Sequence, residues 1–305
     1  MKKWAYNILF ISVLGFYLSL PLYAKEDLEN PTIPTTSKLY YTIQKYTGFN
    51  TLIDFLTESI LKTIIKHKTH AKTLDVDLKI YSGWDLIRKK AQSLQIKGNY
   101  LSINGIPIDY IELQTQGPIY FKKEIVNEQT GKKRNLVQMP VKLLARVEID
   151  LTSVSKALNN LPKWQKVFKE LDLPIPPFGS TKVALNNLNI NINEMGSVTV
   201  SSSITSTKNR NSAPLNLIFE GILKIENERI IISNLQSEVR DIFTKDSDIG
   251  KAFSKLLKDL INPIFSFHKY EKKGLKIEHI DMSFKTNKLI LIITSNLIPT
   301  TKKRN

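Results

Sequence analysis

Apolar residues recur at two spacings along the chain, and the spacing predicts where helices and strands lie. After Asn50, apolar positions fall three or four residues apart and predict an amphipathic helix of about four turns. The same spacing returns within 251–267, where Pro263 is expected to kink or end a second long helix. The two apolar stripes comprise Leu52, Ile53, Leu56, Ile60, Leu61 and Ile64 in the first helix, and Phe253, Leu256, Leu257, Leu260, Ile261 and Ile264 in the second.

Elsewhere, apolar and polar residues alternate, which is typical of strands with one face in water. This period of two runs through 74–80, 141–149 and 188–192. Asn104-Gly105 lies between two apolar runs and predicts a tight hairpin. A closing hairpin is expected to turn at Thr286-Asn287.

Three further segments connect these strands. Asp150 is placed to cap a helix that runs through Leu158. Segment 122–135 is polar and contains a glycine, so we expect a long hairpin loop there. Segment 161–171 predicts another helical piece, closed by a proline cluster.

The order helix, strands, helix, strands, helix, strands favours an α+β fold over alternating βα units. A curved antiparallel sheet wrapped around the long amphipathic helices would bury both apolar surfaces and form an elongated half-barrel with an apolar cavity. We expect this cavity to be lined by Leu52, Leu56, Ile60, Ile64, Phe253, Leu257 and Ile261. A close-packed core would need the same surfaces, so both interpretations stay open.

The N-terminus predicts export. Lys2-Lys3 precede a charge-free run that ends at Ala24, and a polar, proline-bearing stretch follows, as in a secretory signal peptide. We therefore expect a signal peptide over 1–24, a polar linker over 25–38, one α+β domain over 39–298 and a basic tail over 299–305. An uncleaved membrane anchor is the alternative, because the apolar run could just span a bilayer. Either way, the rest of the chain would lie in the periplasm or cell envelope.

The chain is strongly basic, with 44 Lys and Arg against 28 Asp and Glu. Removing residues 1–24 takes away two lysines and no acidic residue, so the formal charge falls from +16 to +14. The basic residues are scattered, and an exported protein rarely meets nucleic acid, so no nucleic-acid partner is expected. Solvated surface charge and attraction to anionic lipid head groups are the two interpretations.

The composition excludes much site chemistry. There is no cysteine, which rules out disulfides, zinc–thiolate sites and cysteine nucleophiles. His67 and His70 are one helical turn apart, but they lie at a helix end among lysines and favour solvation over metal binding. No nucleophile elbow, phosphate-binding loop or dinucleotide motif is present. We therefore expect no enzyme, no cofactor and no metal.

Two segments carry a family resemblance. NYLSINGIPIDYIELQTQGPIYF and QMPVKLLARVEIDLTSVSKALNN resemble the LmeA-like family of secreted phospholipid-binding proteins. The match lies in the strand pair at Ile106–Thr115, the strand at Gln138–Ile149 and the short helix ending in Leu158-Asn159. The resemblance implies a tubular lipid-binding fold, in which a bent sheet encloses an apolar cavity.

The resulting expectation is a non-enzymatic envelope protein. It would bind phospholipid acyl chains in an apolar cavity, for lipid transfer or maintenance of envelope lipids, and its basic residues would contact anionic membrane. The alternative is a structural or assembly protein of the envelope with a fully packed core and no lipid ligand.

Overall fold

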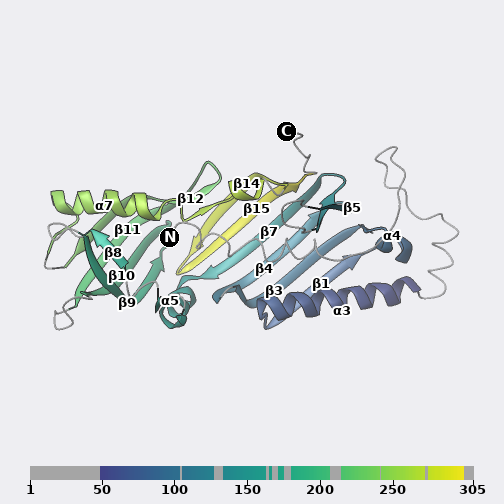
Figure 1. Cartoon of the computed structure of the whole chain (residues 1–305), viewed down its shortest axis with the longest axis horizontal. Coiled ribbons are helices and arrows are strands. Elements are labelled where there is room, and N and C mark those ends of the chain that lie inside the picture. The colour runs from purple at the N-terminus through teal and green to yellow at the C-terminus, as the bar shows by residue number, and fades with distance from the viewer. Residues whose placement is uncertain are drawn as a thin grey trace.

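A computed structural model describes residues 49–103, 105–126, 133–162, 165–166, 171–174, 180–206, 214–240, 242–271 and 274–298. The protein is mostly antiparallel sheet with a few helices, and it is elongated, with two six-stranded sheets following one another along the long axis (Figure 1). The first sheet has the order β1-β3-β4-β7-β15-β14. Its strands are β1 (Thr73–Lys79), β3 (Ser93–Ile103), β4 (Ile106–Gln116), β7 (Val141–Asp150), β14 (Leu275–Lys285) and β15 (Lys288–Leu297).

The second sheet has the order β13-β12-β11-β10-β9-β8, and every pairing in it is antiparallel. Its strands are β8 (Leu171–Pro174), β9 (Ser180–Ile192), β10 (Ser197–Ser206), β11 (Leu215–Glu226), β12 (Arg229–Val239) and β13 (Phe265–Ser266). A small third sheet joins β2 (Lys90–Ala91), β5 (Ile119–Val126) and β6 (Lys133–Val137).

The helices lie against the margins of these sheets. They are α3 (Phe49–Thr69), α4 (Gly83–Ile87), α5 (Leu151–Asn160), α7 (Asp248–Ile261) and α8 (His268–Glu271). Helix α3 packs on β1, the edge strand of the first sheet, and α7 packs on β12 of the second. Helix α5 contacts β9 of the second sheet and also β4 and β7 of the first, so it spans the junction.

Local sequence explains these elements. The side chain of Asp150 accepts a hydrogen bond from the Thr152 N–H and caps α5, as predicted. Strand β1 alternates exposed and buried residues along its whole length, which confirms the period of two. The hairpin between β14 and β15 turns at 286–287, also as predicted.

The two sheets meet at that last turn. The Asn287 N–H donates to the Ile192 carbonyl at 2.9 Å, and the Ile192 N–H donates to the Asn287 side-chain oxygen at 3.3 Å. Gly196 also lies here with φ of +79°, and a Cβ at this glycine would come 2.5 Å from the Phe284 ring. The glycine is therefore needed both for its backbone conformation and for the close approach of the two sheets.

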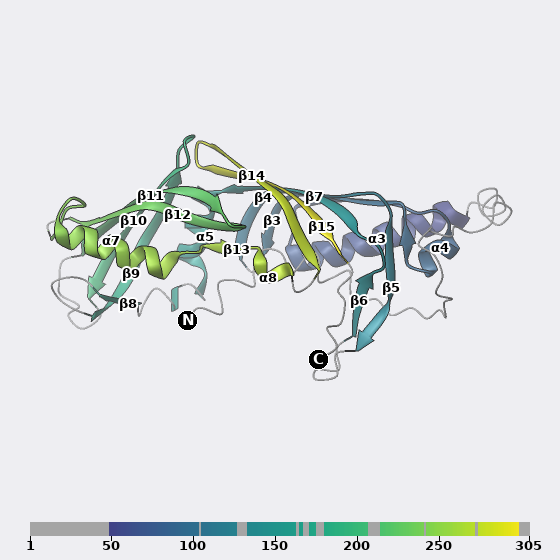
Figure 2. The same cartoon turned by 90° about the horizontal axis from the view of Figure 1, so that it is seen from above.

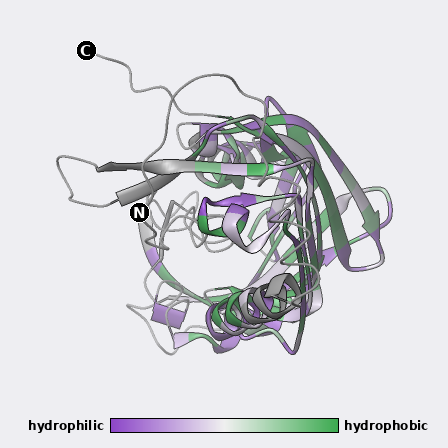
Figure 3. Ribbon diagram, turned by 90° about the vertical axis from the view of Figure 1, so that its right-hand side faces the viewer, coloured by the Kyte–Doolittle hydropathy of each residue, from purple (hydrophilic) through white to green (hydrophobic). Residues whose placement is uncertain are grey.

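Seen along the long axis, the first sheet curls into a half-barrel (Figure 3), and the helices and the β5–β6 hairpin lie on one side of the arch (Figure 2). The α+β class and the curled antiparallel sheet agree with the sequence-based prediction. The wrapped arrangement does not, because α3 and α7 run along sheet margins rather than inside one barrel. An apolar cavity is likewise not shown by the described residues.

Segment 122–135 was expected to be a loop, yet β5 and β6 extend into it. Lys122, Ile125 and Val126 pair with strand partners there. The predicted helix over 161–171 lies mostly outside the described residues, and so do the signal peptide, the polar linker and the basic tail. Within the described part of the chain, no helix combines the length and hydropathy needed to cross a membrane.

Candidate functional site: an apolar inner face on the curled sheet

Every strand of the first sheet contributes buried apolar side chains to one face, which we call the inner face. In β7 the alternation is strict, with Val141, Leu143, Ala145, Val147 and Ile149 all buried. Pairing aligns these residues with apolar residues on both sides. Ala145 lies opposite Leu113 of β4 and Ile293 of β15. The inner face is thus apolar from β1 to β14, interrupted by Thr115 and Ser295.

The apolar surface continues into the second sheet. There the buried residues of β10 and β11 include Val198, Val200, Ile204 and Leu217. The helices have their main contacts with β1, β9, β12 and β14, which lie at or next to the sheet edges. We call the buried apolar residues of β7, β15, β10 and β11 the central lane.

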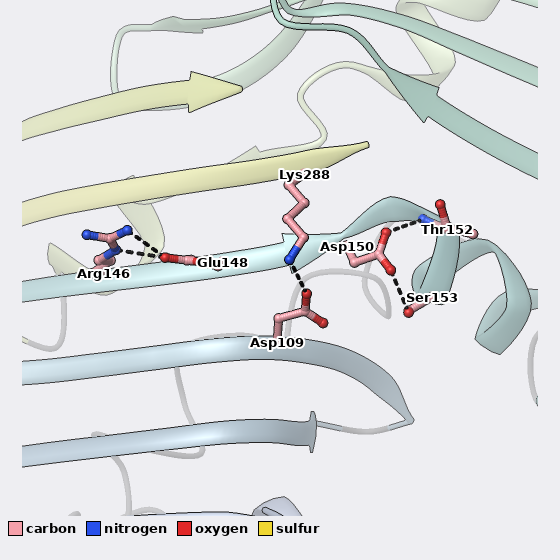
Figure 4. Close-up of polar contacts among 7 residues, drawn as sticks. All are labelled: Asp109, Arg146, Glu148, Asp150, Thr152, Ser153 and Lys288. Atoms are coloured by element: carbon pink, nitrogen blue, oxygen red, sulfur yellow. Dashed lines mark hydrogen bonds and ion pairs between the residues drawn. The ribbon is translucent and has the colours of Figure 1, made fainter. Parts of the chain in front are cut away.

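The opposite face of the first sheet is mostly polar. Lys288 of β15 reaches over β7 to Asp109 of β4, with 3.2 Å between Nζ and Oδ2 (Figure 4). Arg146 pairs with Glu148 of the same strand, with 2.6 Å between Nη2 and Oε1. Such exposed pairs contribute little stability, but they fix this face as the one in contact with water.

One carboxylate on this polar face, that of Glu112, is held ionised by hydrogen bonds. Burial alone would raise the pKa of Glu112, but hydrogen bonds from Tyr110, Lys97 and Gln95 outweigh it and lower the pKa. The hydrogen bond to Asp109 raises the pKa of Lys288. These shifts follow from charge pairing, and none gives a carboxyl group that is protonated at neutral pH for acid catalysis.

The structure places the predicted site residues of α3 in two ways. Leu52 and Leu56 belong to the helix, but their side chains lie outside the described part of the chain. Ile60 is 54% exposed and Ile64 is half-buried, whereas Leu61 is buried. The helix packs on β1 through Leu61 and residues at four-residue intervals after it, Ile65 and Thr69. Ile60 and Ile64 lie beside this contact between α3 and β1.

The predicted residues of α7 are part of a packed core. Phe253 and Leu257 are 1% and 4% exposed, and Ile261 is half-buried. The Phe253 ring meets Phe243 edge-on, with 5.4 Å between centroids. Helices α3 and α7 lie at opposite ends of the long axis in both side views (Figures 1 and 2). The two stripes therefore lie in different parts of the molecule.

A depression of about 60 Å³ lies beside β11 and β12. Its lining is largely polar and charged, and comprises Ile218, Glu220, Gln236, Ser237, Glu238 and Lys245. A volume this small holds a water molecule or two, not an acyl chain. Lipid could not occupy this depression.

Helix α4 lies near one end of the molecule and carries exposed apolar residues (Figure 1). The sequence favoured core packing for Trp84, with contact to an interface or lipid as the alternative, and its exposure contradicts the first interpretation. Trp84 and Ile87 of α4 are 50% and 38% exposed, and Arg88 beside them is also exposed. We call these three residues the α4 tip. Ile87 and Arg88 were not predicted to join Trp84, because a five-residue helix is too short to show a stripe.

The fold and the inner face define an elongated α+β protein whose curled antiparallel sheet buries an apolar face. No family model and no curated protein matches the chain. A crystal structure of lipopolysaccharide binding protein aligns over 73% of this chain and 87% of that chain, with 7% identity and a TM-score of 0.18. A TM-score this low is no basis for a shared fold, and the resemblance to the LmeA-like family stays a prediction.

Proposed function

We propose that the protein is a non-enzymatic, exported lipid-binding protein of the cell envelope, and that phospholipid acyl chains lie along the central lane. The observation that carries the proposal is the inner face, which is apolar in every strand of the first sheet while the outer face is mostly polar. Full burial of a ten-carbon length of acyl chain contributes about 8 kcal/mol. Because the lane residues are already buried, with Ala145 at 4% exposed, this gain requires the protein groups that cover them to move aside.

The basic surface has a second role in this proposal. Each Lys or Arg near an anionic membrane contributes about 1 kcal/mol, so a formal charge of +14 after cleavage favours docking on acidic lipid. The α4 tip adds an exposed indole ring, an aliphatic side chain and a guanidinium group, a combination suited to the interface of a bilayer. The resemblance to the LmeA-like family supports the same function.

The second candidate is a structural envelope protein with a packed core. The burial of Phe253 and Leu257 and the small, polar depression favour it. The two candidates differ in what the central lane contacts. In the first it contacts acyl chains that can be displaced, and in the second it contacts only protein.

The test is native mass spectrometry of the full chain recovered from its own envelope, followed by lipid extraction. We expect a bound phospholipid. The variant Ala145→Trp places an indole ring in the central lane at a residue that is 4% exposed. A lipid-filled lane should accept the ring by releasing lipid, with little change in thermal stability, whereas a packed core should be overpacked and lose about 1–3 kcal/mol.

The matched control is Arg146→Trp, which puts the same ring on the next residue of β7, facing the polar side. It should keep both lipid and stability. Absence of lipid from the native protein, together with destabilisation of Ala145→Trp, would replace the lipid-binding function with the structural one.

A further inference from the structure

Three metal-ligating side chains converge where the turn between β11 and β12 meets α8. Glu228 comes from the turn, and His268 and Glu271 lie one helical turn apart on α8. The Nδ1 atom of His268 is 3.6 Å from Glu228 Oε2 and 3.3 Å from Glu271 Oε2. The three ligand atoms all lie within 4.8 Å of one another.

The two separations from His268 match the geometry of a tetrahedral zinc ion, and the two carboxylate oxygens lie within 4.8 Å of each other. With Zn–N and Zn–O bonds of about 2.0–2.2 Å, two ligand atoms on one tetrahedron are about 3.3–3.6 Å apart. A direct hydrogen bond between imidazole and carboxylate would be shorter, at about 2.7–2.9 Å. The exposed pair of His279 and Asp281 shows that shorter geometry, with 2.8 Å between Nε2 and Oδ1. The Glu228–His268–Glu271 cluster is therefore spaced for an ion between its members.

Glu228 supplies a second observation. Its side chain is 34% exposed, but its Oε2 atom is buried and forms no hydrogen bond in the described part of the chain, with His268 Nδ1 3.6 Å away. A buried carboxylate oxygen without a donor is costly, and a bound cation would remove that cost. The backbone at Glu228 is also unusual. Asn227 and Glu228 lie in a turn, and both have positive φ, of 49° and 56°. Glycine is the usual residue at such a position, so a glutamate there carries strain.

The backbone holds the cluster together without the ion. The Phe267 N–H donates to the Glu228 carbonyl at 3.0 Å, and Arg229 pairs with Ser266 across β12 and β13. These contacts fix the turn beside the start of α8. The ligand atoms are thus brought into range by main-chain hydrogen bonds, which is how a preorganised site is built.

We propose that Glu228, His268 and Glu271 form a zinc site, with water as the fourth ligand. One imidazole and two carboxylates suit Zn²⁺ better than Ca²⁺ or Mg²⁺, which prefer oxygen ligands alone. The bound ion would clip α8 to the β11–β12 turn, and so strengthen the outer edge of the second sheet. This site is independent of the central lane.

The test is calorimetric titration of the full chain with Zn²⁺, on protein without a histidine tag and stripped with a chelator. We expect one equivalent per chain. The chain has four histidines and no cysteine, so four single variants cover every imidazole and no thiolate competes. His268→Ala should abolish binding, and Glu271→Gln should weaken it at least about tenfold. His67→Ala, His70→Ala and His279→Ala should bind as the wild type does.

Folding does not confuse the result, because the His268 side chain is 65% exposed and the conservative Glu271→Gln keeps size and shape. Zinc should also raise the thermal midpoint of the wild type and not that of His268→Ala. The proposal is overturned by a wild type that does not bind Zn²⁺, or by binding that survives His268→Ala and is lost in one of the other histidine variants.

Discussion

Asn159, the penultimate residue of α5, hydrogen-bonds to the backbone of β9 at a point where β9 is not paired with β8. Its side-chain amide donates to the Leu188 carbonyl at 2.7 Å, and its side-chain oxygen accepts from the Leu188 N–H at 2.9 Å. Strand β8 pairs with β9 only as far as Val183, so the β9 backbone at Leu188 has no partner on that side from β8. Asn159→Ala would remove both bonds at once.

The expected loss can be worked from these contacts. Two hydrogen bonds contribute about 1 kcal/mol each, and truncation also leaves the Leu188 N–H and carbonyl short of partners. Leu188 is half-buried, so water satisfies part of that demand. We expect Asn159→Ala to lose about 2–3 kcal/mol of unfolding free energy, which lowers the thermal midpoint by about 4–12 °C in a protein of this size.

Urea denaturation followed by circular dichroism measures this loss, with linear extrapolation to water. The control is Asn186→Ala on the same strand, where an exposed amide makes one long bond of 3.3 Å to Thr205. That variant should lose less than about 0.5 kcal/mol. Equal losses at the two asparagines, or a loss below about 0.5 kcal/mol at Asn159, would refute the view that α5 supplies the missing partner for β9.

Three further predictions concern stability and membrane contact. Asp150→Ala should lose about 1 kcal/mol of stability at neutral pH. Burial opposes ionisation of Asp150, but the hydrogen bonds from Ser153 and Thr152 outweigh burial and lower its pKa. This stabilisation is therefore present above the ordinary carboxyl pKa of about 3.9, and it is lost as the pH falls through the pKa of the folded state. A difference between wild type and variant in urea that persists at about pH 2 would contradict it. Leu257→Ala should lose about 2–5 kcal/mol of unfolding free energy, whereas Ile60→Ala should lose about 0.5 kcal/mol. The reason is that Leu257 is 4% exposed and Ile60 is 54% exposed. Similar shifts of the thermal midpoint for both variants would show that burial in α3 and α7 is misassigned. Trp84→Ala should weaken sedimentation of the protein with vesicles rich in acidic phospholipid. Met195 is 86% exposed in the β9–β10 turn, and Met195→Ala should not weaken it. Equal binding of both variants would show that the α4 tip does not contact the membrane.

Much of the fold could be predicted from the sequence, because its local signals agree with the final packing. The period of two in Val141–Ile149 became β7, the hairpin at 286–287 formed, and Asp150 caps α5. Each of these depends on neighbours within one element or one turn. Helix and strand propensity, helix capping and the alternation of apolar and polar residues act at that range, so they can be recognised from the sequence alone.

The candidate site was less predictable, because it depends on where elements lie relative to one another. The stripes of α3 and α7 look alike in sequence, yet they lie at opposite ends of the molecule. An amphipathic pattern shows that one face of a helix is buried, but it does not show which strand buries it. In α3 the apolar stripe is wide, and the side that packs was decided by β1, which is why Leu61 is buried and Ile60 is not.

Helix α5 connects these observations. It begins beside β7 of the first sheet, where Asp150 caps it, and it ends on β9 of the second sheet, where Ser155 and Asn159 bond the strand backbone. The sheets also meet through the polar contacts of the turn residue Asn287, the Gly196–Phe284 approach and the contacts of β11 and α8 with β14. Buried apolar residues of both sheets belong to one core. This ten-residue helix therefore adds to a junction that a shared core also stabilises. Helix α5 is thus the helix that contacts strands of both sheets, and it does so beside the central lane.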